Sequence, residues 1–140
     1  MNIIDAHCDT LHEAVQRGLT LTDDALCVSL PKLRQYGGFI QFFAAWIDDA
    51  EMQPFLRANH LIDKFYRELE DNRDTMAQIL SFEDFESAFL DGRVGAMLTV
   101  ENGNCLEGTL SNLHRLYQLG VRALTLCWNG SNEIADGIGV

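Results

Sequence analysis

Residues Val94–Val100 read VGAMLTV, and Glu101 and the pair Asn102-Gly103 follow them directly. This run is almost wholly apolar and has no clean alternation, which is typical of a strand buried on both faces of a parallel sheet. The Asn-Gly pair marks a turn at its end. We therefore expect a central strand with a glutamate at its carboxyl end.

Further strands and helices are expected on both sides of this stretch. Strand character recurs in Asn2–Ala6, Gly38–Trp46 and Val121–Leu126. Apolar spacing and capping residues predict helices between them, at Pro31–Tyr36, Met52–Asn72, Ser81–Gly92 and Thr109–Gly120. Residues 10–23 are expected to form a loop. Alternating strands and helices indicate an α/β fold with a parallel sheet. Four such strands form either a small open sheet or the first half of an eight-stranded barrel, which needs about 250 residues.

The composition excludes several classes of partner. With 10 Lys and Arg against 21 Asp and Glu, the formal net charge is −11, whereas nucleic acids and anionic membranes attract clustered basic residues. The apolar stretch Phe39–Ile47 is too short to cross a bilayer, and Met1–Asp5 does not have the pattern of a secretory signal. We therefore expect no nucleic-acid or membrane partner, and a cytoplasmic protein with four reduced thiols: Cys8, Cys27, Cys105 and Cys127.

Two residues at the end of the first predicted strand have side chains that can bind metal. His7 and Asp9 are two positions apart, so on a strand they project to the same side. An imidazole nitrogen and a carboxylate oxygen are ordinary zinc ligands. The same pattern also suits a polar strand end at which Asp9 caps the following turn. Cys8, between them, is expected to point the other way and to pack in the core.

Glu101 stands at the carboxyl end of the central strand, where functional groups gather in barrels and in open α/β sheets. Its two oxygens can each bind one cation. The alternative is a solvated loop glutamate, since most glutamates are exposed. Taken together with His7 and Asp9, Glu101 makes a metal site at the ends of two parallel strands the better interpretation.

Four segments of the chain carry a resemblance to a known family. Ile4–Thr10 (IDAHCDT) contains an Asp-x-His-x-Asp run, and Leu98–Gly103 (LTVENG) places a glutamate after a buried strand. Leu124–Asp136 (LTLCWNGSNEIAD) continues from Leu-Thr-Leu to an Ala-Asp pair, and Leu30–Trp46 matches in character. These segments resemble the renal (membrane) dipeptidase family of zinc metallopeptidases. The resemblance implies the N-terminal half of a TIM-type (β/α)8 barrel, so that residues 1–140 form a single partial domain, truncated at its C-terminal end.

The resemblance also implies a role for each matching residue. His7 and Asp9 would bind one zinc ion, Glu101 would bridge it to a second, and Asp5 would orient His7 from outside the ligand set. Two adjacent zinc ions suit the hydrolysis of a small dipeptide, because they polarise its carbonyl and activate water. Trp128 takes the place of a family histidine that contacts the substrate. An indole has one donor and no acceptor, so we expect it to bind substrate differently.

The family draws two further histidine ligands, a substrate-binding arginine and an acid–base aspartate from its later strands. The remaining histidines here are His12, His60 and His114, and the last two are expected on solvated helix faces. No catalytic residue is therefore expected within this chain, which alone should be inactive.

Two other functions are considered. A non-catalytic half-barrel could bind metal and form a homodimer, because a half-barrel leaves two sheet edges unpaired. A related amidohydrolase acting on another amide is disfavoured, because such enzymes usually open with His-x-His where this chain has His7-Cys8-Asp9.

Overall fold

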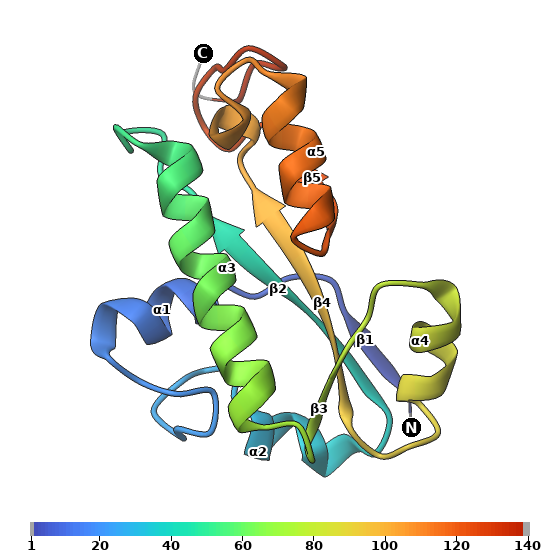
Figure 1. The fold of residues 1–140 in the computed structure, drawn as a ribbon. Coiled ribbons are helices and arrows are strands. Elements are labelled where there is room, and N and C mark those ends of the chain that lie inside the picture. The colour runs from blue at the N-terminus through green and yellow to red at the C-terminus, as the bar shows by residue number, and fades with distance from the viewer. Residues whose placement is uncertain (1, 139–140) are drawn as a thin grey trace.

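The computed structural model describes residues 2–138 as a parallel sheet with helices packed against it (Figure 1). The strands are β1 (Ile3–Asp5), β2 (Phe39–Trp46), β3 (Met76–Gln78), β4 (Val94–Glu101) and β5 (Val121–Thr125). The α-helices are α1 (Thr10–Arg17), α2 (Leu30–Leu33), α3 (Pro54–Asp71), α4 (Phe82–Ala88) and α5 (Leu110–Gln118). Two 3₁₀ turns, η1 (Arg34–Tyr36) and η2 (Gly103–Leu106), complete the set.

The five strands are all parallel, and β4 is at the centre of the pairing. The order is β1-β2-β4, and both β3 and β5 pair with the other side of β4. β3 lies against its first residues, Val94–Ala96, and β5 against its last, Leu98–Glu101. Because the strands are parallel, their carboxyl ends point the same way. The sheet does not close on itself within residues 2–138, which is what is expected of half a barrel.

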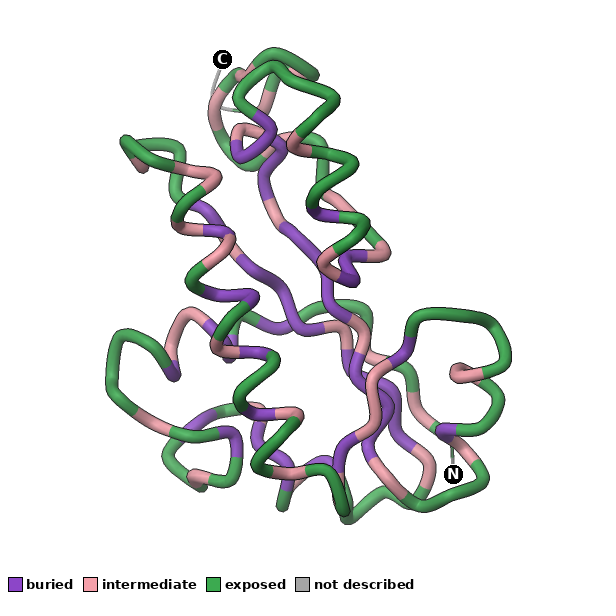
Figure 2. The backbone as a smooth tube through the Cα atoms, in the orientation of Figure 1, coloured by how far each residue is buried: buried purple, intermediate pink, exposed green. Residues whose placement is uncertain are grey.

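Alternate residues of β2 and β4 pack on opposite faces of the sheet, which follows from the period of two along a strand. Phe43 and Leu98 belong to the larger apolar cluster, which includes Phe65 of α3. Ile40 belongs to a smaller cluster on the other face, with Ala88 of α4. Figure 2 shows β2 and β4 as nearly continuous buried segments. The two long strands are therefore held between helices, and they give the site a rigid base.

The sequence-based prediction of four parallel strands with intervening helices is confirmed for those four strands, but it missed two elements. β3 has only three residues, too few for an alternating pattern to be recognised. Residues 10–23 were expected to form a loop, and this was wrong for its first part, which forms α1. Only Thr10, Leu11 and Ala14 of α1 are buried, so its apolar stripe is narrow. Its end is marked by Gly18, whose φ of 65° is the left-handed conformation common after helices.

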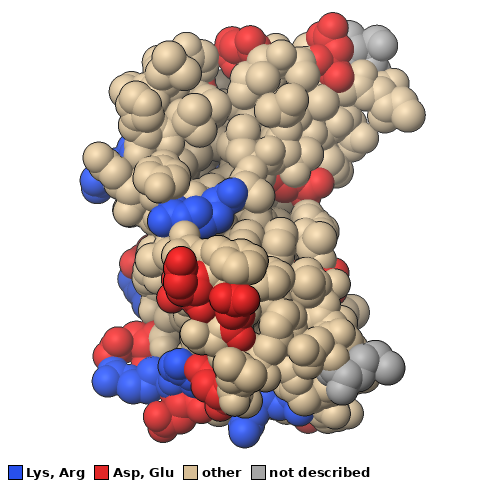
Figure 3. Space-filling model, turned by 90° about the vertical axis from the view of Figure 1, so that its right-hand side faces the viewer, with Lys and Arg blue, Asp and Glu red and all other residues tan. Residues whose placement is uncertain are grey.

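The free edge formed by β3 and β5 carries exposed apolar side chains. Figure 3 views the side of the molecule on which α4 and α5 lie: its upper half is mostly uncharged, and acidic and basic side chains gather in its middle and lower part. Apolar pockets of about 300 and 150 Å³ lie near this edge, with Arg122 in the wall of both. No helix within residues 2–138 is long and apolar enough to span a membrane.

Candidate metal centre

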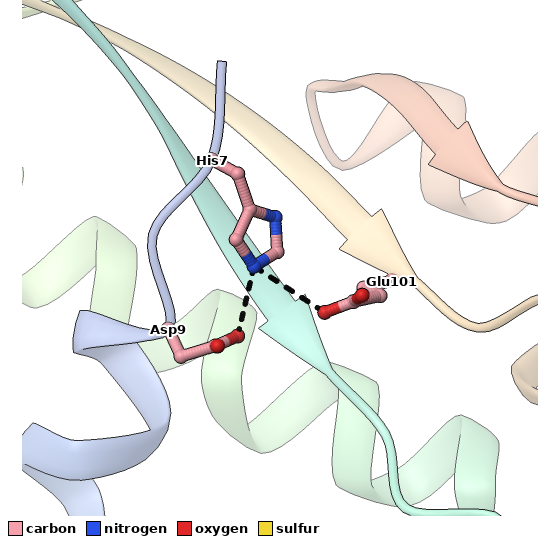
Figure 4. A group of neighbouring side chains, drawn as sticks. All are labelled: His7, Asp9 and Glu101. Carbon is pink, nitrogen blue, oxygen red and sulfur yellow. Dashed lines mark ion pairs between the residues drawn. The ribbon is translucent and has the colours of Figure 1, made fainter. Parts of the chain in front are cut away.

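Three side chains converge at the carboxyl ends of the first and central strands (Figure 4). His7 and Asp9 lie in the segment between β1 and α1, and Glu101 is the last residue of β4. The Nε2 atom of His7 is 3.3 Å from Oδ1 of Asp9 and 3.4 Å from Oε2 of Glu101. One ligand atom from each residue lies within 4.8 Å of the other two. Residues 94 positions apart in the chain thus meet at one point.

The expectation that His7 and Asp9 lie on a strand is only partly met, because β1 ends at Asp5. The backbone nevertheless bonds to β2 again beyond β1, at Cys8. The Cys8 N–H donates to the Phe42 carbonyl at 3.1 Å, and the Cys8 carbonyl accepts from the Ala44 N–H at 3.0 Å. These two bonds hold Cys8 against β2, where its side chain packs in the core, while the side chains of His7 and Asp9 meet each other at 3.3 Å.

Asp9 occupies the residue before α1, where an aspartate often caps the helix. Its side chain makes no capping hydrogen bond, and it faces the imidazole of His7 instead. The capping role that the sequence left open is therefore not used. Both oxygens of this carboxylate remain available to a ligand.

The surroundings of Glu101 shift the preference of its carboxyl towards the protonated form in the absence of a cation. Burial raises its pKa above the ordinary value, the charge of His7 opposes that effect, and the charge of Asp9 adds to it. A divalent cation among the three side chains would reverse this preference, because a nearby positive charge favours the carboxylate. One imidazole and two carboxylates are a donor set that zinc accepts, so the residues present fit such an ion.

Asp5 supports His7 through the backbone. Its Oδ1 atom accepts a hydrogen bond of 3.2 Å from the His7 N–H, which is a main-chain group and not part of the imidazole ring. Any orienting effect of Asp5 would therefore act on the main chain of the segment that carries His7.

Trp128 lies beside the site, after β5, and its side chain is 37% exposed. Its ring packs edge-on against Trp46, with 5.1 Å between the ring centroids. Trp46 ends β2 and is the register partner of Glu101 on β4. The sequence did not single out Trp46, although its position at the end of a buried strand matches that of Glu101.

The other histidines and cysteines lie outside the three-residue group. His60 and His114 are exposed, as expected from their helix faces. His12 packs against Trp46 at 4.7 Å between ring centroids, one aromatic side chain away from Glu101. The thiol of Cys8 is buried and its pKa is raised to about 12 by desolvation, so it is a core group.

The sequence matches the family model described as membrane dipeptidase (peptidase family M19) over residues 1–140. The chain belongs to the membrane dipeptidase family. Its members are metallopeptidases, which agrees with the cluster of ligand-type side chains at the sheet edge.

Named relatives agree with this membership. The dipeptidase ataJ of Aspergillus terreus is 25% identical over 117 residues, which cover 76% of this chain and 28% of that protein. A solved dipeptidase of family M19 superposes with a TM-score of 0.83 at 19% identity, covering 92% of this chain and 43% of its own. A Rhodobacter sphaeroides metallopeptidase, solved with a phosphinate mimic of the dipeptide L-Ala-D-Ala, gives a TM-score of 0.80 at 18% identity and covers 92% and 46%.

The chain spans less than half the length of each of these proteins. The structural likeness shows the fold, an open α/β sheet that matches one part of the larger relatives.

Proposed function

We propose that this chain supplies the first metal-binding half of a zinc dipeptidase site that hydrolyses small dipeptides. The observation that carries the proposal is the convergence of His7, Asp9 and Glu101, whose ligand atoms lie within 4.8 Å of one another. In the proposal two zinc ions occupy the complete site. When bound, they supply Lewis acidity towards the peptide carbonyl and an acidified water.

The three side chains have different parts in this proposal. His7 and Asp9 would hold one zinc ion, and Glu101, which has two carboxylate oxygens, would be shared between the two ions. Asp5 restrains the main chain at His7 through its 3.2 Å hydrogen bond. Residues restrained in this way lose less freedom when they bind a ligand, which favours binding.

Trp128 is proposed to contact the substrate from the β5 side. The indole N–H can donate to a substrate oxygen, and the ring excludes water from one side of the site. Its edge-on contact with Trp46 holds the ring in place. Catalytic acid–base groups and further ligands are proposed to come from outside these 140 residues, so that the chain alone binds metal and has little activity.

Zinc titration of the purified chain, followed by calorimetry, tests the metal site. We expect binding by the wild type and its loss in His7→Ala and in Glu101→Ala. Asp74→Ala is the matched control, because Asp74 is an exposed acid that precedes β3, at the opposite end of the sheet. Equal zinc binding by all four proteins would contradict the proposal. In the longest native form of the protein, Glu101→Ala should also abolish hydrolysis of Ala-Ala dipeptides.

A cytoplasmic location remains a prediction from the sequence.

Homodimerisation is a second, separate proposal. The free edge carries exposed apolar residues, among them Leu80 shortly after β3 and Leu126 directly after β5, and pairing of two copies there would bury them. Sedimentation velocity should then show dimers that increase with protein concentration. A single monomeric species at all concentrations would contradict this second proposal.

A further inference from the structure

A polar pocket of about 360 Å³ lies next to the candidate metal centre and has no part in the metal site described above. It is lined by His12, Gln16, Trp46, Asp48, Glu51 and Arg57. Trp46 connects the two places. Its register partner is Glu101, and its ring packs on that of His12 with 4.7 Å between centroids. Only the side chain of Trp46 therefore separates this pocket from a ligand bound at the metal centre.

Arg57 is the unusual member of this pocket. Its Nη2 atom lies 3.0 Å from Nδ1 of His12, and because a guanidinium has only donors, the ring nitrogen must accept. The imidazole is therefore neutral. Burial and the charge of Arg57 both lower the pKa of His12, which keeps it so. Within residues 2–138 Arg57 forms no ion pair, although it is only half exposed.

The two acids of the pocket are engaged with their own loop. Asp48 Oδ1 accepts from the Ala50 N–H at 2.8 Å, and Glu51 Oε1 accepts from the Gln53 N–H at 3.0 Å. Neither neutralises the guanidinium, so most of the five N–H donors of Arg57 are available. A planar guanidinium with free donors is suited to bidentate recognition of a carboxylate.

The charged side chains of the pocket limit which ligands can bind in it. A bare anion would be repelled by Asp48 and Glu51, whereas a ligand with both a carboxylate and an ammonium group can satisfy the acids and Arg57 together. Every dipeptide carries an ammonium and a carboxylate at its termini, and an acidic dipeptide has a second carboxylate on its side chain that can meet Arg57 while the terminal groups bind elsewhere. We propose that Arg57, held by His12, binds the side-chain carboxylate of an acidic residue in a dipeptide, and so selects substrates for the adjacent metal centre. This inference rests on the proposed dipeptidase function for its biological meaning, but the binding itself does not require the metal.

The test compares two isosteric dipeptides, L-Glu-L-Ala and L-Gln-L-Ala, titrated into the ¹⁵N-labelled chain with and without zinc. The resonances to follow are the Arg57 Nε–H and the indole N–H of Trp46. We expect L-Glu-L-Ala to shift both and to bind about ten-fold more tightly than L-Gln-L-Ala, as for a hydrogen bond to a charged group. Arg57→Gln should remove this preference, and Arg57→Lys should keep part of it.

Arg67→Gln is the matched control, because Arg67 lies on the same helix, is exposed and pairs with Asp63 at 2.7 Å. It should keep the full preference. Equal affinity for the two dipeptides, binding of neither, or a preference that survives Arg57→Gln would overturn the inference. If the chain binds zinc but has equal affinities for the two dipeptides, the proposed role of Arg57 is wrong and the dipeptidase proposal is unaffected. If the chain prefers L-Glu-L-Ala but binds no zinc, the dipeptidase proposal is wrong and the proposed role of Arg57 is supported.

Discussion

The side chain of Asn102 donates a hydrogen bond of 2.7 Å to Oδ1 of Asp49, and the two residues tie together the loops that follow β4 and β2. Asp49 Oδ2 also accepts from the Gly130 N–H at 2.8 Å, which brings in the loop after β5. Asn102 is buried, with 1% of its surface exposed, and its φ is 85°. It directly follows Glu101, so this network fixes the backbone on which the candidate metal ligand stands.

Replacing Asn102 separates the two parts of its role. Asn102→Gly removes the hydrogen bonds but tolerates the positive φ, whereas Asn102→Ala removes them and adds backbone strain. We expect both variants to lower the free energy of unfolding, and Asn102→Ala to do so by about 1 kcal/mol more. Urea denaturation measures the difference. Equal stability of the two variants would show that the positive φ carries no cost.

Metal binding should be visible in the intrinsic fluorescence. The chain has two tryptophans, Trp46 and Trp128, and they contact each other beside Glu101. We expect Co²⁺, which is a chemically similar and paramagnetic substitute for zinc, to quench their emission in the wild type. Glu101→Gln should need a much higher Co²⁺ concentration for the same effect. Quenching curves that coincide would place the bound metal elsewhere.

Glu68 of α3 is a buried acid whose removal should be costly. It is 2% exposed, pairs with Lys64 at 2.6 Å and accepts from the Leu21 N–H at 2.9 Å. Glu68→Ala leaves that N–H without a partner and removes the carboxylate from the partly buried ammonium of Lys64, which keeps only its hydrogen bond to the Leu19 carbonyl. We therefore expect a loss of about 3 kcal/mol in the free energy of unfolding. Glu70→Ala, an exposed acid on the same helix, should change it by less than about 0.5 kcal/mol. Similar losses in both variants would contradict this assignment.

Buried thiols should weaken the fold at alkaline pH. Burial raises the pKa of Cys105 from an ordinary 9.0 to about 12, and the charge of Glu107 adds to it. Between these two values the unfolded chain has lost the proton and the folded chain has kept it, so the free energy of unfolding falls as pH rises, by at most about 1.4 kcal/mol per pH unit. Denaturation at pH 8, 9 and 10 should show a steeper fall for the wild type than for Cys105→Ala. Parallel pH profiles would rule out this contribution.

Much of the fold could be read from the sequence because the signals are local. The long strands β2 and β4 are apolar runs, which predict burial on both faces of a sheet. Helix α3 has apolar residues that repeat every three to four positions. The capping box between Ser81 and Asp84 was recognised by its spacing and is present in the structure. β3 was missed because it has only three residues, and α1 because its apolar stripe is narrow.

For the site, residue type and spacing were enough to single out His7, Asp9 and Glu101 as candidate metal ligands, because the ability of a side chain to bind metal depends on its residue type. That they meet within 4.8 Å depends on the parallel pairing of β1, β2 and β4. The contact between Arg57 and His12, the edge-on packing of Trp46 against both His12 and Trp128, and the network of Asn102 depend on it as well. These contacts join residues 34 to 82 positions apart. No periodicity or motif reports such distances, since only the packing of helices on a shared sheet brings those side chains together.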